Sequence, residues 1–361
     1  MSGQARGGSR APADVPGRGT AEPTQEERAA AAAVLRMIWG LHVSRALYAV
    51  TALGVPERLA GGPASCAELA AHSGAHEPSL YRVLRLLAAL GVVSEGPPRS
   101  FSLTILGSRL LPDAPASMRS WALLHGTVAG PPFEHILHTI RTGQPALDAA
   151  YGMGLFEYLT QHPRDAAVFD VAMMERTAAF APSVAGGYDF SDVRTVVDVG
   201  GGRGTLLAAI LRAHGHLQGT LFELPAVAAG ASAVLADAGV ADRCQVIAGD
   251  FSDGVPEGAD CYVLANVLHD WDDARAAAIL ASCRKAVTRH GRVLIVERLI
   301  PDDPAEAVAV LLSDINMLVL SPGGRERTNT EYGDLLRAAG LRPGVIRPVA
   351  LPYGIIEGLP G

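Results

Sequence analysis

The segment Thr195-Val-Val-Asp-Val-Gly-Gly-Gly-Arg-Gly-Thr-Leu-Leu207 joins an apolar, β-branched run to a carboxylate and a cluster of glycines. A helical pattern of apolar residues, 206–212, follows directly. This order predicts a strand, a tight turn and a helix, as in a nucleotide-binding β-α unit, where glycine lets the backbone approach a ligand closely. A tight turn without a ligand is the alternative. The dinucleotide pattern G-x-G-x-x-G fails because its third glycine position falls on Thr205, so the compact turn favours a ligand without a pyrophosphate.

The composition is that of an ordinary globular protein with room for two domains. The chain has 361 residues, of which 49% are hydrophobic and 19% are charged. A formal net charge of -7 argues against a nucleic-acid-binding surface spread over the molecule. The four cysteines show no C-x-x-C spacing, so we expect neither a disulfide framework nor a zinc site.

Two patterns bear on where the protein resides. The N-terminal residues are polar, with no apolar core after a basic start, so a signal peptide is not expected. The apolar run 29–50 contains Arg36, His42 and Arg45, which indicates a buried helix and not a membrane span. We therefore expect a cytoplasmic protein with no membrane partner.

The first part of the chain predicts a disordered tail followed by helices. Residues 1–24 hold Gly, Ser, Arg, Pro and Ala without periodicity, which is typical of disorder. From residue 26 to about residue 54, apolar residues recur at helical spacing on several faces. Helices of this kind often pack against a second copy of the protein, so we expect a homodimer.

Residues 65–111 follow the order of a winged helix: a capped helix, a turn, a second helix, and two short strands around a proline-rich turn. Ser65 is the expected cap of the first helix. DNA binding is the alternative function for such a domain, but its second helix offers only Arg82 and Arg85 as basic groups among many leucines. A winged-helix dimerisation domain over residues 25–115 is therefore favoured.

The rest of the chain divides into two predicted parts. Residues 116–187 are expected to form a helical linker that contributes helices to a substrate pocket, and residues 188–361 to form a catalytic domain. In the catalytic domain strands alternate with helices, which predicts a parallel, doubly wound α/β sheet. The expected strands are 195–199, 220–223, 245–248, 260–265 and 292–297, with two more at one edge from the tail, 345–349 and 353–357.

Acidic and aromatic residues stand where these strands end. Glu223 ends the second strand, where a carboxylate can accept both hydroxyls of a ribose; a solvated strand-end charge is the alternative. Asp250 and Phe251 follow the third strand, where they can bind the amine and the ring of an adenine. Because ligands of open α/β sheets bind at the carboxyl ends of the strands, these groups predict a nucleoside site there.

The fourth strand ends in Val263-Leu-Ala-Asn-Val-Leu-His-Asp-Trp-Asp-Asp273, which brings a histidine and three acids to the same cleft. At this point the sequence resembles the small-molecule O-methyltransferases that use S-adenosylmethionine, a family that includes caffeic-acid-type plant enzymes and bacterial antibiotic-tailoring enzymes. The resemblance covers the C-terminal half in order, and the winged-helix N-terminal half also fits. The matching pieces are Val197-Asp-Val-Gly-Gly-Gly202, Phe222-Glu-Leu-Pro225, Gly249-Asp-Phe251, Leu268-His-Asp-Trp271, Leu294-Ile-Val-Glu297 and Gly323-Gly-Arg-Glu-Arg-Thr328.

The resemblance implies a Rossmann-like methyltransferase sheet with S-adenosylmethionine as cofactor and S-adenosylhomocysteine as its product. It also implies a reaction without a metal. By position in the family motifs, Gly200 and Gly202 line the cofactor and Glu223 holds its ribose. Asp250 and Phe251 hold its adenine.

For catalysis, the resemblance implies that His269 is the general base and that Glu297 and Glu326 hold its imidazole. A buried structural histidine is the alternative. Some methyltransferases bind magnesium through clustered acids, but Asp272 and Asp273 are interpreted as charges at a helix start. The residues implied for substrate contact are Asp270 beside the base, and Phe169, Met173 and Met317, for which plain core packing is the alternative.

Two positions depart from the plant members of the family. Ala265 stands where they have a lysine four residues before the histidine, which leaves one cofactor contact unassigned. Ser321 stands where they have an asparagine, which argues against a plant-like substrate. We therefore predict methyl transfer to a phenolic hydroxyl of a small aromatic secondary metabolite. The alternatives are hydroxylation, decarboxylation or a pericyclic reaction on the same scaffold, and a winged-helix regulator that senses a small molecule.

Overall fold

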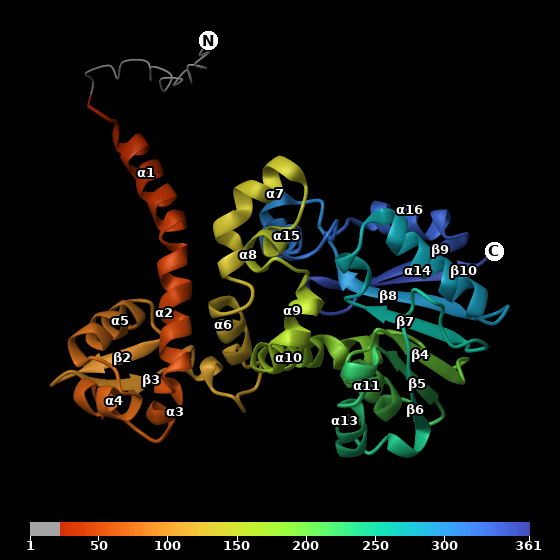
Figure 1. The fold of residues 1–361 in the computed structure, drawn as a ribbon, viewed down its shortest axis with the longest axis horizontal. Coiled ribbons are helices and arrows are strands. Elements are labelled where there is room, and N and C mark those ends of the chain that lie inside the picture. Colours follow the sequence, from red (N-terminus) through yellow and green to blue (C-terminus); the bar gives the residue numbers. More distant parts are fainter. Residues whose placement is uncertain (1–21) are drawn as a thin grey trace, which may run out of the picture. The chain divides into compact units, whose positions relative to one another are not determined.

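The computed structural model describes residues 22–361, which divide into two compact units with the boundary between Val43 and Ser44. The first unit contains α1 (Gln25–Ile38) and the start of α2 (Gly40–Ala52) (Figure 1). The second unit contains the remaining elements, among them both of the sheets.

The start of α1 is fixed by a capping box. Thr24 accepts the backbone N–H of Glu27, and the Glu27 carboxylate accepts the backbone N–H of Thr24. Of the segment 1–24 that is predicted to be disordered, residues 1–21 lie outside the described residues. Thr24, in the same segment, is ordered as the cap of α1. The continuous helical pattern predicted from residue 26 onward is divided at Trp39, where α1 ends and α2 begins.

The second unit begins with the predicted winged helix. Ser65 caps α4 through a second capping box, with Glu68 as its partner. Helix α5 packs through Leu84 and Leu87 against Phe101 of a three-stranded sheet, and all three side chains are fully buried. The sheet has the order β1-β3-β2. Its elements are α3 (Val55–Ala60), β1 (Ala64–Ser65), α4 (Cys66–Ser73), α5 (Glu77–Ala89), β2 (Val93–Gly96), β3 (Ser100–Leu103) and the 3₁₀ turn η1 (Gly107–Leu110).

A group of helices, most of them short, separates the winged helix from the large sheet. Their apolar residues form a cluster with Val319 and Leu320 of the later helix α15 (Pro304–Leu320). The domain boundaries proposed at residues 115 and 187 stay predictions. The helices are α6 (Arg119–Gly126), the 3₁₀ turn η2 (Pro131–His135), α7 (Ile136–Thr142), α8 (Ala146–Tyr151), α9 (Leu155–Gln161) and the long α10 (Pro163–Gly187).

The large sheet has the strand order β6-β5-β4-β7-β8-β10-β9, which confirms the predicted doubly wound α/β fold. The strands from β6 to β8 are parallel, whereas β10 is antiparallel to both β8 and β9. The predicted tail strands therefore exist, but they form a hairpin, because the short connection 349–352 leaves no room for a crossover. The strands are β4 (Thr195–Val199), β5 (Gln218–Glu223), β6 (Cys244–Ala248), β7 (Cys261–Ala265), β8 (Arg292–Arg298), β9 (Leu341–Pro348) and β10 (Tyr353–Pro360).

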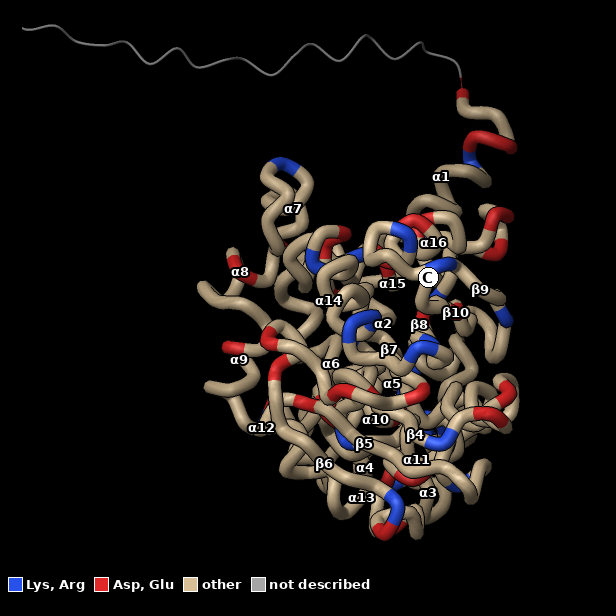
Figure 2. The backbone as a smooth tube through the Cα atoms, turned by 90° about the vertical axis from the view of Figure 1, so that its right-hand side faces the viewer, with Lys and Arg blue, Asp and Glu red and all other residues tan. Residues whose placement is uncertain are grey.

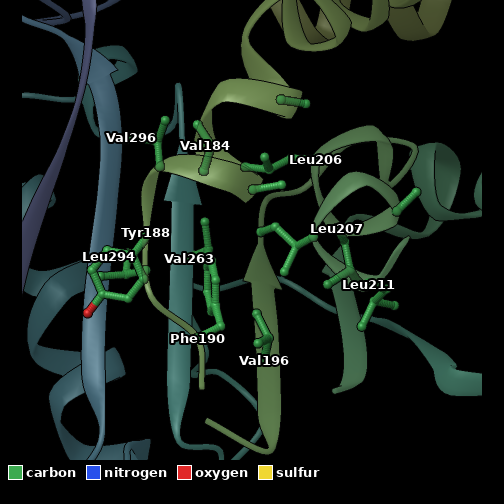
Figure 3. Close-up of a cluster of buried hydrophobic side chains, with 14 of the residues drawn as sticks. Val184, Tyr188, Phe190, Val196, Leu206, Leu207, Leu211, Val263, Leu294 and Val296 are labelled. Carbon is green, nitrogen blue, oxygen red and sulfur yellow. The ribbon is translucent and has the colours of Figure 1, made fainter. Parts of the chain in front are cut away.

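Helices cover both faces of this sheet because alternate strand residues point to opposite faces. On one face Val196, Val263 and Leu294 belong to one buried cluster with Leu206 and Leu207 of α11, and Leu294 lies beside Tyr188 (Figure 3). On the other face, neighbouring residues of the same strands pack against α14 and α16. The remaining elements are α11 (Thr205–Ala213), α12 (Pro225–Ala228), α13 (Ala231–Asp237), η3 (Ala241–Arg243), η4 (Leu268–Asp270), α14 (Asp273–Ala286) and α16 (Asn329–Ala338).

The charges of the described residues are mixed in sign. Figure 2 shows acidic and basic residues interspersed along the helices and loops around the large sheet. Among residues 22–361, none of the helices has the length and apolar character that crossing a bilayer requires.

Candidate active site

The glycine turn after β4 has a backbone that only glycine adopts easily. Gly200, Gly202 and Gly204 have φ angles of 66°, 60° and 83°, in the left-handed region. Gly201 lies directly on Asp198, and a Cβ atom there would collide with the Asp198 carboxyl group. The glycine cluster therefore lets the chain fold back tightly over the end of β4.

Asp198 is a functional candidate that the sequence reasoning did not single out. Its carboxyl group is buried beneath the glycine turn, and neither oxygen has a hydrogen-bond partner among the described residues. Burial raises its pKa to about 7, and the nearby Glu223 charge adds to the rise. A buried acid without a partner beside a glycine turn fits a ligand that brings a hydrogen-bond donor or a cation.

Glu223, at the end of β5, is held at the rim of the same turn. The N–H of Gly202 donates to Glu223 Oε2 at 2.8 Å, and the N–H of Leu224 donates to Oε1 at 2.7 Å. Burial raises the Glu223 pKa, while these two N–H groups oppose the rise. Each carboxylate oxygen has a second lone pair, so the group can also accept two hydroxyls of a ribose.

Asp250 and Phe251 follow β6 at the same edge of the sheet. Asp250 is exposed, and its Oδ1 accepts the N–H of Ser252 at 2.7 Å, which lowers its pKa. The half-buried Phe251 ring meets Trp271 edge-on at a centroid distance of 6.0 Å. Phe251 also faces the glycine turn, since a Cβ atom on Gly200 would lie 3.8 Å from its ring. The residues predicted to bind the cofactor therefore meet at one edge of the sheet.

His269 lies in η4, the 3₁₀ turn that follows β7, and its side chain is almost fully buried. Its Nδ1 atom is 3.4 Å from Glu326 Oε1 and 3.6 Å from Glu297 Oε2. Its Nε2 atom lies 3.7 Å from Asp270 Oδ1. Nδ1 thus faces two buried carboxylates that come from distant parts of the chain, which leaves Nε2 as the nitrogen available for a substrate.

Glu297 connects the histidine to the sheet. Its Oε1 accepts the backbone N–H groups of Val267 at 3.0 Å, Leu268 at 2.9 Å and His269 at 3.4 Å. One oxygen of Glu297 therefore fixes the backbone of η4, while the other faces the imidazole. Full burial raises the Glu297 pKa to about 7, although His269 opposes the rise.

Glu326 is held by groups that sequence reasoning missed. Ser313 of α15 donates its hydroxyl to Glu326 Oε1 at 2.7 Å, and Arg298 Nη1 lies 3.6 Å from the same oxygen. Burial raises the Glu326 pKa, but the hydrogen bonds and charges of its partners outweigh burial and lower it. For His269 the balance is similar: burial lowers its pKa, and the charges of Glu297, Asp270 and Glu326 raise it to a greater extent.

Arg327 positions the loop that carries His269. Its fully buried guanidinium donates to the carbonyl oxygens of Leu268 at 2.9 Å and Trp271 at 2.7 Å, and it pairs with Asp273 at 2.9 Å. The segment Gly323–Thr328 belongs to the family pattern, so the signal was present in the sequence. The role of Arg327 could not be predicted from the sequence, because it depends on a contact between residues that are 59 positions apart.

The residues predicted for substrate contact lie on two helices and the catalytic turn. Phe169 and Met173 of α10 are half-buried in the apolar cluster that includes Val319 and Leu320 of α15. Met317, on the same helix α15, is buried. Asp270 is half-buried beside His269. Their contact with a substrate stays a prediction.

The acids near His269 bear on the question of a metal. Asp272 caps α14 by accepting the N–H of Arg275 at 2.8 Å, and Asp273 pairs with Arg327, so both have structural partners. One ligand atom each of His269, Glu297 and Glu326 lies within 4.8 Å of the others, a spacing that a metal ion also accepts. Glu297 Oε1 already accepts hydrogen bonds from the backbone of η4. Glu326 Oε1 already accepts the Ser313 hydroxyl and faces His269 Nδ1.

Comparison with known protein families gives two matches in this chain. Residues 133–342 match the O-methyltransferase domain. Residues 35–113 match the O-methyltransferase dimerisation domain. The two matches follow the order predicted from the sequence, with the dimerisation region before the sheet.

Individual proteins resemble the chain over most of its length. It is 41% identical over 327 residues to phenazine O-methyltransferase PhzM of Lysobacter antibioticus, which covers 91% of this chain and 95% of that protein. The solved structure of mitomycin 7-O-methyltransferase MmcR superposes with a TM-score of 0.88 at 38% identity, covering 93% of this chain and 99% of MmcR. An O-methyltransferase from neocarzinostatin biosynthesis, solved with S-adenosylmethionine and 2-hydroxy-5-methyl naphthoic acid, gives a TM-score of 0.80 at 36% identity over 91% of this chain and 98% of that one.

One relative has a different activity. Aclacinomycin 10-hydroxylase RdmB of Streptomyces purpurascens is 38% identical over 327 residues, covering 89% of this chain and 86% of that protein. The matched domain families and the nearly complete coverage of relatives above 30% identity nevertheless agree on one assignment. The protein belongs to the S-adenosylmethionine-dependent O-methyltransferases with an N-terminal dimerisation domain.

Proposed function

We propose that the enzyme transfers the methyl group of S-adenosylmethionine to a phenolic hydroxyl of a small aromatic secondary metabolite, with His269 as general base. The observation that carries this proposal is the orientation of His269, whose Nδ1 faces Glu297 and Glu326. This arrangement commits Nδ1 to carry the proton and leaves Nε2 to accept one. Relatives named for phenazine and mitomycin support an aromatic acceptor.

The residues present fit the cofactor. Glu223 would hold the ribose through its free lone pairs, and Asp250 with Phe251 would hold the adenine. Gly200 and Gly202 would line the path of the cofactor, since no side chain projects from them, and Asp198 offers a buried acid beneath that turn. When bound, S-adenosylmethionine supplies an electrophilic methyl group on a sulfonium centre.

The chain's own contribution is to accept a proton and to hold the acceptor. A free phenol has a pKa of about 10 and an ordinary histidine about 6.5, so full deprotonation before reaction is unfavourable. The raised His269 pKa narrows this gap. As the hydroxyl oxygen of the acceptor reacts, Nε2 takes the proton of that hydroxyl. General-base help of this kind raises the rate by about 10²–10⁴-fold. Glu297 and Glu326 stabilise the imidazolium that forms.

The pH dependence of kcat/KM follows from the His269 pKa. Its neutral form is active, so the rate rises as pH increases through the pKa and levels off above it. Because the charges of Glu297, Asp270 and Glu326 raise this pKa, we expect the midpoint above pH 6.5. Asp270→Asn should move the midpoint to lower pH, since the variant removes a charge 3.7 Å from Nε2. A wild-type midpoint at or below 6.5, or an unchanged midpoint in the variant, would contradict this account.

The direct test of the proposed function is to incubate the enzyme with methyl-labelled S-adenosylmethionine and a panel of phenols. Label on the phenolic oxygen of the product is the expected result. The second candidate function is hydroxylation or decarboxylation on the same scaffold. It would be favoured if the enzyme bound the cofactor and labelled no phenol, but converted an aromatic polyketide to a hydroxylated or decarboxylated product. That candidate has support from the identity to aclacinomycin 10-hydroxylase.

We further propose that the enzyme is a homodimer through its N-terminal domain and that the second copy also covers part of α15. Val308, Leu311, Leu312 and Ile315 lie on one face of this helix at helical spacing and are 39–68% exposed. The dimerisation-domain match at residues 35–113 supports a second copy as the partner, and α15, outside that range, offers a further apolar face for it.

We expect sedimentation at twice the chain mass of 37.5 kDa, and a shift toward the single-chain mass for Leu312→Arg. The charge would be buried without a partner in the interface. Leu351→Arg, at a 92% exposed position outside α15, is the matched control and should remain dimeric. A monomeric wild type, or a Leu312→Arg variant as dimeric as the control, would refute the assignment of this face.

A further inference from the structure

Arg176 lies on the face of α10 that carries Phe169 and Met173, and it has no role in the proton transfer to His269. Phe169, Met173, Arg176 and Phe180 are spaced by four, three and four residues, so they share one face of the helix. Phe169 and Met173 belong to the apolar cluster with α15, and Phe180 belongs to the core against the large sheet. Arg176 is therefore a cation set between two apolar parts of one helix face.

The surroundings of this face locate the guanidinium near the catalytic groups. One turn after Arg176, the Phe180 ring stacks on Tyr353 at a centroid distance of 4.2 Å. The Tyr353 hydroxyl donates to Asn266 Oδ1 at 3.2 Å, at the end of β7. Burial raises the pKa values of Asp270 and Glu297, and the positive charge of Arg176 opposes this rise. The guanidinium thus lies within electrostatic reach of the residues that flank His269.

Arg176 lacks the partners that other arginines near the site have. Arg203 pairs with Asp170 at 2.7 Å, and Arg298 lies 3.6 Å from Glu326. By contrast, no ion pair or hydrogen bond joins Arg176 to another residue in the range 22–361, and its buried Nε has no partner. The adjacent acid, Glu175, forms no ion pair with Arg176 in the same range, and its own buried Oε2 lacks a partner. A half-buried guanidinium without a partner is costly, which favours an anionic ligand group opposite it.

We infer that Arg176 binds a carboxylate of the aromatic acceptor, so that the substrates are hydroxylated arene carboxylic acids. This inference rests on the proposed function and narrows its substrate class. A guanidinium presents a planar fork of N–H donors that matches a carboxylate in a bidentate pair. Phe169 and Met173 offer the apolar surface that an aromatic ring attached to that carboxylate requires. Without Arg176, the carboxylates of Asp270, Glu297 and Glu326 would repel an anionic substrate.

The test compares hydroxybenzoic and hydroxynaphthoic acids with their matched primary carboxamides. Binding to the dimeric enzyme saturated with S-adenosylhomocysteine is measured by titration calorimetry. We expect the best acid to bind at least tenfold more tightly than its carboxamide. Arg176→Gln should weaken binding of the acid by about 10–100-fold, because a charge-assisted pair is lost, and change the carboxamide affinity less than threefold. The affinity of Arg176→Lys for the acid should lie between those of the wild type and Arg176→Gln, because lysine keeps the charge but lacks the planar fork of N–H donors.

Arg164→Gln is the matched control, because Arg164 is an exposed arginine on the same helix. It should leave both affinities unchanged. An equal loss for acid and carboxamide in Arg176→Gln would assign Arg176 a structural role and overturn the inference, as would a wild type that binds no acid of the panel or prefers the carboxamides. Methylation of neutral phenols by the wild type tests the proposed function separately. If the wild type methylates neutral phenols and shows no preference for acids, the inference about Arg176 fails and the proposed function stands.

Discussion

His269→Ala is expected to lower kcat by about 10²–10⁴-fold, the usual contribution of a general base. The variant removes the group that accepts the hydroxyl proton, whereas the glycine turn and Glu223 that would hold the cofactor stay in place. Single-turnover transfer from labelled S-adenosylmethionine measures the chemical step, and calorimetry measures S-adenosylhomocysteine affinity. We expect the rate to fall and the affinity to stay within about threefold.

The control for this prediction addresses the buried carboxylates that the substitution leaves behind. Without the imidazole, Glu297 and Glu326 lose a partner, and the variant loses stability for that reason. His269→Gln, which keeps more of the side-chain volume, and a thermal melt of both variants separate lost folding from lost chemistry. Unchanged product formation by a folded His269→Ala variant would remove His269 from the mechanism.

Glu223→Ala is expected to weaken S-adenosylhomocysteine binding by about 10²–10⁴-fold. The estimate assumes two ribose hydroxyls, each donating a hydrogen bond of about 1.5–3 kcal/mol to the charged carboxylate. The variant also frees the N–H groups of Gly202 and Leu224, which loosens the turn that would carry the cofactor. Calorimetry with the dimeric enzyme measures the dissociation constant.

Two further variants sharpen this result. Glu223→Gln keeps one acceptor oxygen and should give an intermediate affinity, whereas Glu257→Ala removes an exposed acid away from the strand end and should have no effect. If Glu223→Ala binds S-adenosylhomocysteine within threefold of the wild type, Glu223 is the solvated strand-end charge that its position also allows.

Much of the nucleoside site was predictable because its residues follow one another along short segments. The strand at 195–199 and the left-handed glycines after it are local features, set by β-branched residues and by the absence of a Cβ. Glu223 and Asp250 could be predicted to meet at one edge, since each ends or follows a strand and a parallel sheet aligns those ends.

The partners of His269 could be named only through resemblance to a family. Glu297 and Glu326 lie 28 and 57 residues from the histidine, and nothing in the local pattern brings either one to Nδ1. Ser313, Arg298 and Arg327 were missed for the same reason.

The sequence by itself determined the doubly wound sheet, the winged helix and the strand-end positions of the nucleoside residues, because hydrophobic periodicity and glycine conformation act over a few neighbouring residues. Only the tertiary structure decided that the tail hairpin pairs with β8, that Arg327 fixes the carbonyls around His269, and that Arg176 has no partner in the described chain. Those features depend on packing between segments far apart in the sequence, and burial then sets which charges are paired and which pKa values move.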